Sequence, residues 1–193
     1  MVKIYKGSMP VAYTYSSAGS YSIKIVGNLS SAAFSSNASD NGMQYMLTAV
    51  KKIDGRVEVL DDYAFYNCDK LKEVQMSDSN VLSVGAYAFA ECGSLSGLVY
   101  STQLERIGDH CFDGSSVSSI APAGFDCDTS SGVGYSMPRI NKIGVAAFNN
   151  TAGLQCIAVP QSVPLDSRLL EGAQCLKHTM LLSALSSDAE AVI

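Results

Sequence analysis

Apolar residues recur along this chain with a near-constant period, and phenylalanines mark that period. Phe65, Phe89, Phe112 and Phe148 are 24, 23 and 36 residues apart. Each follows two fixed apolar positions, five and eight residues earlier, and comes directly after a small residue. The position five residues earlier holds Leu60, Val84, Ile107 and Ile143, and the position eight residues earlier holds Val57, Val81, Leu104 and Ile140. The small residues are Ala64, Ala88, Cys111 and Ala147. The pattern predicts stacked coils, because one such coil cannot bury its apolar side alone.

A second set of apolar positions follows each phenylalanine and predicts a strand with one buried face. In the segment from Leu71 to Met76, apolar residues alternate with Lys72, Glu73 and Gln75. This period of two is typical of a half-buried strand. A degenerate fifth copy continues the same columns with Leu165, Leu170, Leu176 and Leu181. We predict that this copy is the C-terminal cap of the stack.

The repeated phrase carries a family resemblance. Val84 to Cys92, followed by Leu95 and Leu98, resembles the spacing I-G-x-x-A-F-x-x-C and L-x-x-V of BspA-like (treponemal-type) leucine-rich repeats. The resemblance covers roughly Val57 to Leu182 and implies an α+β solenoid, with a strand and a short helix or 3-10 turn in each coil. It also implies non-catalytic adhesion or protein binding. The chain departs from the pattern in the third coil, which lacks one residue between Phe112 and Val117.

The residues before the repeats predict a small N-terminal β cap. Residues 11–27 alternate polar and apolar side chains across a Ser/Gly turn, which favours a β-hairpin. The phrase from Tyr13 to Ile23 resembles the Y-T-Y-x-x-A-G-x-Y-x-V signature of PKD-type immunoglobulin-like domains. We therefore predict a cap over 1–53 and a solenoid over 54–182 with an insert at 121–139. Residues 183–193 form a tail or a capping helix, in which Ser187 and Glu190 fit a capping box.

Composition limits the partners and the location. A formal net charge of -5 and no long basic run argue against nucleic acid as partner. No apolar run is long enough for a membrane span. The first residues lack the apolar core of a secretory signal. The chain is therefore expected at the cell surface or outside the cell with its signal elsewhere, or in a virion.

The cysteines and histidines do not form a catalytic or metal-binding constellation. Cys68 and Cys92 occupy one repeat column, where we expect buried, reduced thiols rather than a disulfide framework. His110 and Cys111 are adjacent, so on an extended segment the imidazole and the thiol face opposite ways. His178 has no second ligand at zinc spacing. We predict no enzymatic activity, no cofactor and no metal.

Two surfaces are candidates for binding. The insert carries aromatic and cationic residues of the kind found at interface hot spots, namely Phe125, Tyr135, Met137 and Arg139. Its two rings can alternatively fix the loop onto the solenoid. The strand face offers polar positions, namely Lys72, Gln75 and Tyr100. That face is the usual recognition surface of curved solenoids and can equally be a solvated one.

These observations favour a non-enzymatic protein-binding or adhesion module. The alternative is a phage virion structural protein, such as a decoration, fibre or baseplate component. The expected partner is accordingly a host-surface protein or a virion protein. The apolar C-terminal residues can cover the last coil or meet another subunit, so a homo-oligomer is also compatible with the sequence.

Overall fold

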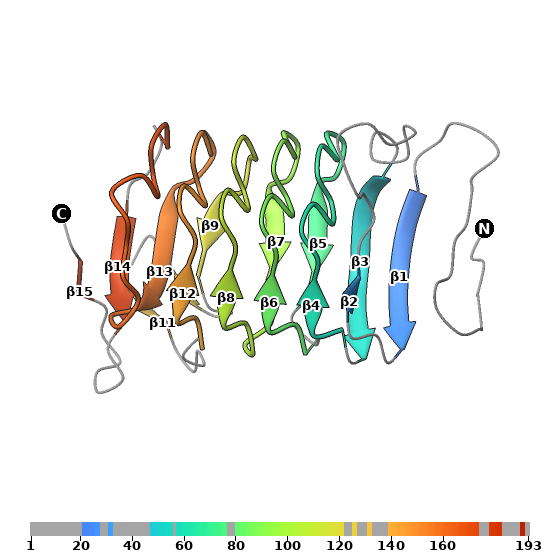
Figure 1. Cartoon of the computed structure of the whole chain (residues 1–193), viewed down its shortest axis with the longest axis horizontal. Coiled ribbons are helices and arrows are strands. Elements are labelled where there is room, and N and C mark those ends of the chain that lie inside the picture. Colours follow the sequence, from blue (N-terminus) through green and yellow to red (C-terminus); the bar gives the residue numbers. More distant parts are fainter. Residues whose placement is uncertain are drawn as a thin grey trace.

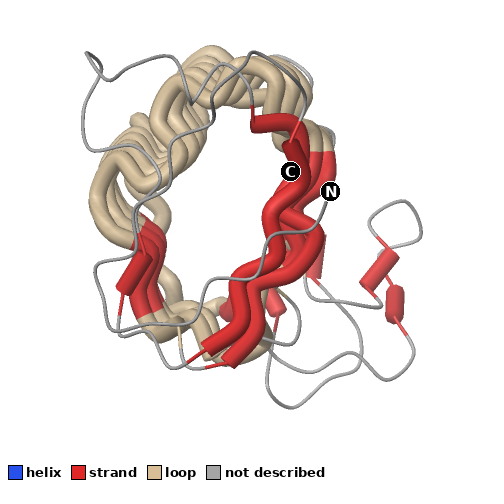
Figure 2. The backbone as a smooth tube through the Cα atoms, turned by 90° about the vertical axis from the view of Figure 1, so that its right-hand side faces the viewer, coloured by secondary structure: helices blue, strands red, loops and turns tan. Residues whose placement is uncertain are grey.

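The computed structural model shows a solenoid whose coils follow one another along a single axis (Figure 1). It describes residues 21–27, 31–32, 47–55, 57–76, 80–121, 125–126, 131–132, 139–173, 178–182 and 190–191. Seen along the axis, each coil is a closed ring with strands on two sides (Figure 2). The predicted ladder of repeated coils is therefore confirmed.

Strands of successive coils pair into ladders. The first ladder contains β1 (Tyr21–Gly27), β3 (Leu47–Gly55), β5 (Glu73–Gln75) and β7 (Gly97–Val99). The second contains β9 (Ser119–Ile120), β13 (Cys156–Pro160), β14 (His178–Leu182) and β15 (Glu190–Ala191). The third contains β2 (Ser31–Ala32), β4 (Val59–Leu60), β6 (Ser83–Val84), β8 (Arg106–Ile107) and β12 (Lys142–Ile143).

Pairing within the ladders is parallel, except that β15 runs antiparallel to β14. In the first ladder Val74 lies opposite Leu98, and in the third Leu60 lies opposite Val84. Each apolar column of the sequence thus becomes a file of side chains about 4.8 Å apart, the spacing of paired strands. Residues that occupy the same column of the sequence repeat therefore lie opposite one another in these ladders.

The phenylalanines form the centre of the core. Phe65, Phe89, Phe112 and Phe148 are all at most 2% exposed. Their rings stack in one file, with centroids 5.0, 5.5 and 5.4 Å apart and interplanar angles of 6°, 2° and 5°. The small residues directly before them are buried as well. The file confirms the alignment of the copies on phenylalanine.

The segment around each phenylalanine is a run of turns, not the short helix or 3-10 turn that we predicted. No helix occurs among the described residues. Every second amide donates to the next coil, as Phe65 N does to Ala88 O at 2.7 Å, while Tyr66 N bonds Tyr63 O at 3.0 Å within the turn. Tyr63 and Asn67 have φ of 60° and 56°. A positive φ at every fourth residue is incompatible with a helix.

The third coil interrupts the strand face. Within the described residues β7 does not pair with β9, although the third ladder continues unbroken past the same coil. Side chains connect the coils there instead: Ser116 Oγ donates to Gly93 O at 2.6 Å, and Ser118 Oγ donates to Ser96 O at 3.3 Å. The residue missing before Val117 shortens this coil, so its backbone cannot keep the ladder register.

The two ends of the chain extend the stack. β1 pairs in parallel with β3, while the first arm of the predicted hairpin and the PKD-like phrase before Tyr21 lie outside the described residues. At the other end, Phe148 N donates to Leu169 O, which places Leu170 in the phenylalanine column. Leu181 pairs with Val159 as the degenerate copy requires. Glu190 and Ala191 form β15, whereas the rest of 183–193 lies outside the described residues.

Three of the cysteines lie in the core of the solenoid. Cys68, Cys92 and Cys111 are buried and free, as predicted for the first two. Cys92 Sγ donates to Phe65 O of the preceding coil at 3.1 Å, and Thr151 Oγ1 in the same column donates to Phe112 O at 3.0 Å. Cys156, which lies outside that column, is disulfide-bonded.

Candidate functional site

The strand face presents polar side chains from β5 and its flanking residues. Lys72 is exposed and Gln75 is half-buried, while Val74 between them points into the core. Tyr100 does not belong to this surface, because its side chain is only 6% exposed. It occupies the column of Met76 and Val159, which are both buried. Burial raises the pKa of Tyr100 above its ordinary value.

The insert contains a short hairpin beside the strand face. β10 (Phe125–Asp126) and β11 (Ser131–Gly132) pair antiparallel and lie outside the ring, next to the long strands (Figure 2). Tyr135 and Met137 lie outside the described residues, as does the side chain of Phe125. Arg139 is exposed and precedes buried Ile140. The hairpin backbone and the strand face therefore share one side of the solenoid.

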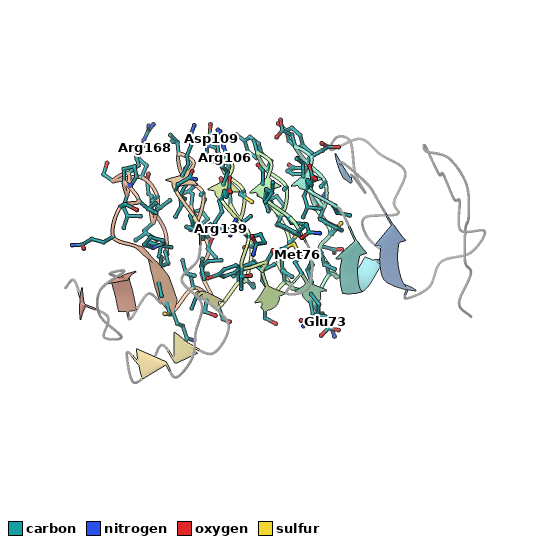
Figure 3. The ribbon with its side chains drawn as sticks, turned by 90° about the horizontal axis from the view of Figure 1, so that it is seen from below. Glu73, Met76, Arg106, Asp109, Arg139 and Arg168 are labelled. Atoms are coloured by element: carbon teal, nitrogen blue, oxygen red, sulfur yellow. The ribbon has the colours of Figure 1, made fainter. Side chains whose placement is uncertain are left out.

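Arg139 is set apart from that side. Figure 3 places it between Glu73 on the strand side and Asp109 on the opposite side. Lys72 belongs to the coil of Phe65, and Arg139 begins the coil of Phe148. The structure thus does not bring these two predicted contact residues together.

A second set of surface residues lies on the turn segments, and sequence reasoning missed it. The rings of Tyr63, Tyr87 and His110 stack with centroids 5.1 and 4.9 Å apart, both pairs within 2° of parallel. Tyr66 meets Tyr63 edge-on at 5.5 Å and 73°. All four side chains are partly exposed. The sequence signal for Tyr63, Tyr87 and His110 was their shared column, two positions before each phenylalanine, but the columns were compared only for buried apolar residues.

Carboxylates and amides border these rings. His110 Nδ1 lies 2.9 Å from Asp113 Oδ2, and the side-chain amides of Asn149 and Asn150 donate to Asp113 at 3.2 to 3.3 Å. Partial burial, followed by the nearby carboxylate of Glu91, raises the pKa of Tyr66 above its ordinary value of 10.0. The turn side is therefore an aromatic surface with negative charge beside it.

The geometry around His110 does not form an imidazole–thiol pair. The imidazole faces outward to Tyr87 and Asp113, while Cys111 is 0% exposed. Burial raises the pKa of the Cys111 thiol, so the reactive thiolate is disfavoured. In the part of the chain that the structure describes, no group of His, Cys, Asp and Glu could hold a metal ion. No helix in that part is long and apolar enough to cross a membrane.

Residues 44–177 match a family described as "BspA type Leucine rich repeat region", in 6 copies. The matched region begins before Val57 and includes β3. No match was found among curated proteins. The chain is similar to leucine-rich repeat proteins of known structure, all at low identity.

A leucine-rich repeat protein from Bacteroides ovatus is 24% identical with a TM-score of 0.57, over 70% of this chain and 31% of that one. A leucine-rich cell surface protein from Faecalibacterium prausnitzii is 24% identical with a TM-score of 0.56, and the match covers 72% of this chain and 33% of that protein. The T. pallidum leucine-rich repeat protein is 24% identical with a TM-score of 0.54, and the match covers 68% of this chain and 57% of that protein. This chain thus spans less than two thirds of each, and the likeness concerns the fold.

Proposed function

The chain belongs to the BspA type leucine-rich repeat family, and on this premise we propose that it is a non-enzymatic protein-binding module with an adhesive role. The observation that carries the proposal is a ladder of paired strands whose polar strand face is flanked by the β10–β11 hairpin on the same side (Figure 2). Repeat proteins of this kind bind partners on such extended faces. Insertions that project beside the face often add contacts.

We further propose that the module works at the cell surface or outside the cell. One similar structure is that of a cell surface protein. The disulfide at Cys156 suits an oxidising compartment, where such bonds persist. The alternative, a virion structural protein, has no support from the family match or from these three structures.

The first test concerns the strand face. Immobilised full-length chain should retain a protein from host-surface extracts, and Lys72→Glu should weaken that binding about tenfold, which corresponds to about 1.4 kcal/mol. Lys142→Glu makes the same charge change at an exposed lysine of β12, on the third ladder, and should leave binding unchanged. Equal losses in both variants, or retention of virion proteins alone, would contradict the proposal.

The second test concerns the insert. Replacing both Phe125 and Tyr135 by alanine should weaken the same interaction by at least tenfold, because buried aromatic anchors dominate interface energies. The melting temperature of this double variant should stay within about 2 °C of the parent if the rings serve a partner. A large fall in melting temperature would instead show that the rings pack against the solenoid.

A further inference from the structure

An aromatic–acidic patch on the turn side has no part in the function proposed above. The patch consists of Tyr63, Tyr66, Tyr87, Glu91, His110 and Asp113, which come from three successive coils. The turn segments that carry it lie across the ring from the long strands (Figure 2). A partner bound at the strand face therefore leaves this patch free.

The stacked rings are not required for the coils to stack. Tyr63, Tyr87 and His110 have φ of 60°, 55° and 52°, a backbone region that costs a side-chain-bearing residue roughly 1 to 2 kcal/mol. The fourth coil has Ala146 in this column at φ 53°, and it still donates Phe148 N to Leu169 O of the next coil. A methyl group thus suffices for the fold. Large aromatic side chains at three strained, partly exposed positions point to a surface role.

The turn side is also strongly acidic. Its segments 61–68, 85–92, 108–115, 144–151 and 166–173 contain seven carboxylates and one cation, Arg168. That arginine lies 3.5 Å from Asp166, within the same segment. The carboxylates are Asp61, Asp62, Glu91, Asp109, Asp113, Asp166 and Glu171. The negative charge of this surface therefore favours a cationic partner.

Glu91 is the carboxylate best placed to receive that cation. It is exposed, and its carboxylate makes no hydrogen bond or ion pair with any described residue, although its backbone N donates to Asp113 O at 2.8 Å. Its carboxylate lies beside Gly114 of the following coil, close enough to Tyr66 that, besides burial, its charge raises the pKa of that hydroxyl group. The Tyr66 ring is turned 73° from Tyr63 and so stands outside the stack. Asp62 and Asp109, by contrast, accept from Ala86 N and Val145 N and so cap the next coil.

We propose that the aromatic–acidic patch binds an arginine-bearing segment of a protein partner. A guanidinium is planar, so it can pair with the Glu91 carboxylate through two hydrogen bonds while it lies against the Tyr66 ring. A lysine ammonium supplies the charge without the flat surface or the paired donors. Arginine therefore binds this patch more tightly than lysine does.

The probe is a synthetic peptide of alternating arginine and glycine, titrated calorimetrically into the full chain at about 0.15 M salt, where long-range attraction is screened. The parent should bind it more tightly than the matching lysine–glycine peptide. Glu91→Gln should weaken binding about threefold to fivefold, and Tyr66→Ala by a similar factor. Glu58→Gln removes one exposed carboxylate before β4 and should change binding less than twofold.

Three results would overturn the inference: no binding of the arginine peptide, an unchanged affinity in Glu91→Gln, or an equal loss in Glu58→Gln. The Glu91 side chain is exposed and its carboxylate has no partner among the described residues, so glutamine in its place does not threaten folding. The strand-face variant Lys72→Glu should bind the arginine peptide as the parent does. Failure at the patch is therefore distinguishable from failure of the strand-face proposal.

Discussion

Replacing Gly108 by alanine should destabilise the folded chain by about 3 kcal/mol or more. A methyl group there would approach Ala86 N and Gly85 C to 2.5 Å and Gly85 O to 2.7 Å. These are backbone atoms of the preceding coil, so no side-chain rotation can relieve the clash, and overpacking of this kind costs about 1 to 3 kcal/mol or more. Separating the coils would also stretch the bond from Gly108 N to Val84 O, now 2.9 Å. Urea unfolding followed by circular dichroism measures the loss.

Gly93→Ala is the matched control. A methyl group at Gly93 meets nothing within 4 Å, so the substitution adds the same atoms in open space. Its free energy of unfolding should stay level or rise by up to about 1 kcal/mol, because alanine restricts the unfolded chain. If both variants lost the same stability, close approach of the coils at Gly108 would not be the cause.

The glycine column shows how the sequence encodes the stacking. Gly85, Gly108 and Gly144 each stand one position after the apolar residue that precedes the turns. At all three, an added side chain would collide with the preceding coil. Aligning the repeat copies within the chain revealed the columns, because every coil places equivalent residues in equivalent surroundings. It did not reveal that the glycines mark the closest approach, since a missing side chain has no hydropathy signal.

The turn conformation could not be predicted from the spacing of the apolar residues. Apolar spacing around Phe65 is compatible with a short helix, a 3-10 turn or a run of turns, because all three bury the same side chain. What decides the conformation is that alternate amides bond to the next coil, which forces a positive φ at residues such as Tyr63 and Tyr87. Tyrosine has no preference for that region. The column two residues after each phenylalanine does carry a signal, because Asn67, Gly114 and Asn150 are of types that adopt a positive φ readily.

The candidate surfaces were predictable only in part. Lys72 is exposed, as alternation along its strand indicated. Tyr100 is buried, and its column membership with Met76 and Val159 was a better guide than its polar hydroxyl group. The stacked rings on the turn side went unnoticed because they share a half-exposed column. In a solenoid, any recurrent large residue in one column is a candidate stack, whether or not the column is buried.

Phe89→Ala should cost about 3 to 5 kcal/mol of unfolding free energy, the usual range for phenylalanine truncated in a core. Phe89 is 0% exposed and lies between Phe65 at 5.0 Å and Phe112 at 5.5 Å, so its removal opens a cavity in the middle of the file. The amides on either side of the cavity remain tied to neighbouring coils, as Phe89 N is to Cys111 O at 2.8 Å. These bonds limit collapse of the cavity, and the cost should therefore lie in the upper half of that range.

A large apolar residue on the surface supplies the comparison for Phe89. Leu165 is 36% exposed and belongs to the degenerate last copy, so Leu165→Ala should change stability by no more than about 0.5 kcal/mol. Chemical denaturation of both variants at equal protein concentration gives the two values. Coils of a solenoid are stabilised mainly by their immediate neighbours, so a break at Phe89 should also lower the cooperativity of unfolding and the slope of the transition. A loss below about 1 kcal/mol for Phe89→Ala, with an unchanged slope, would mean that the phenylalanine file is not what holds successive coils together.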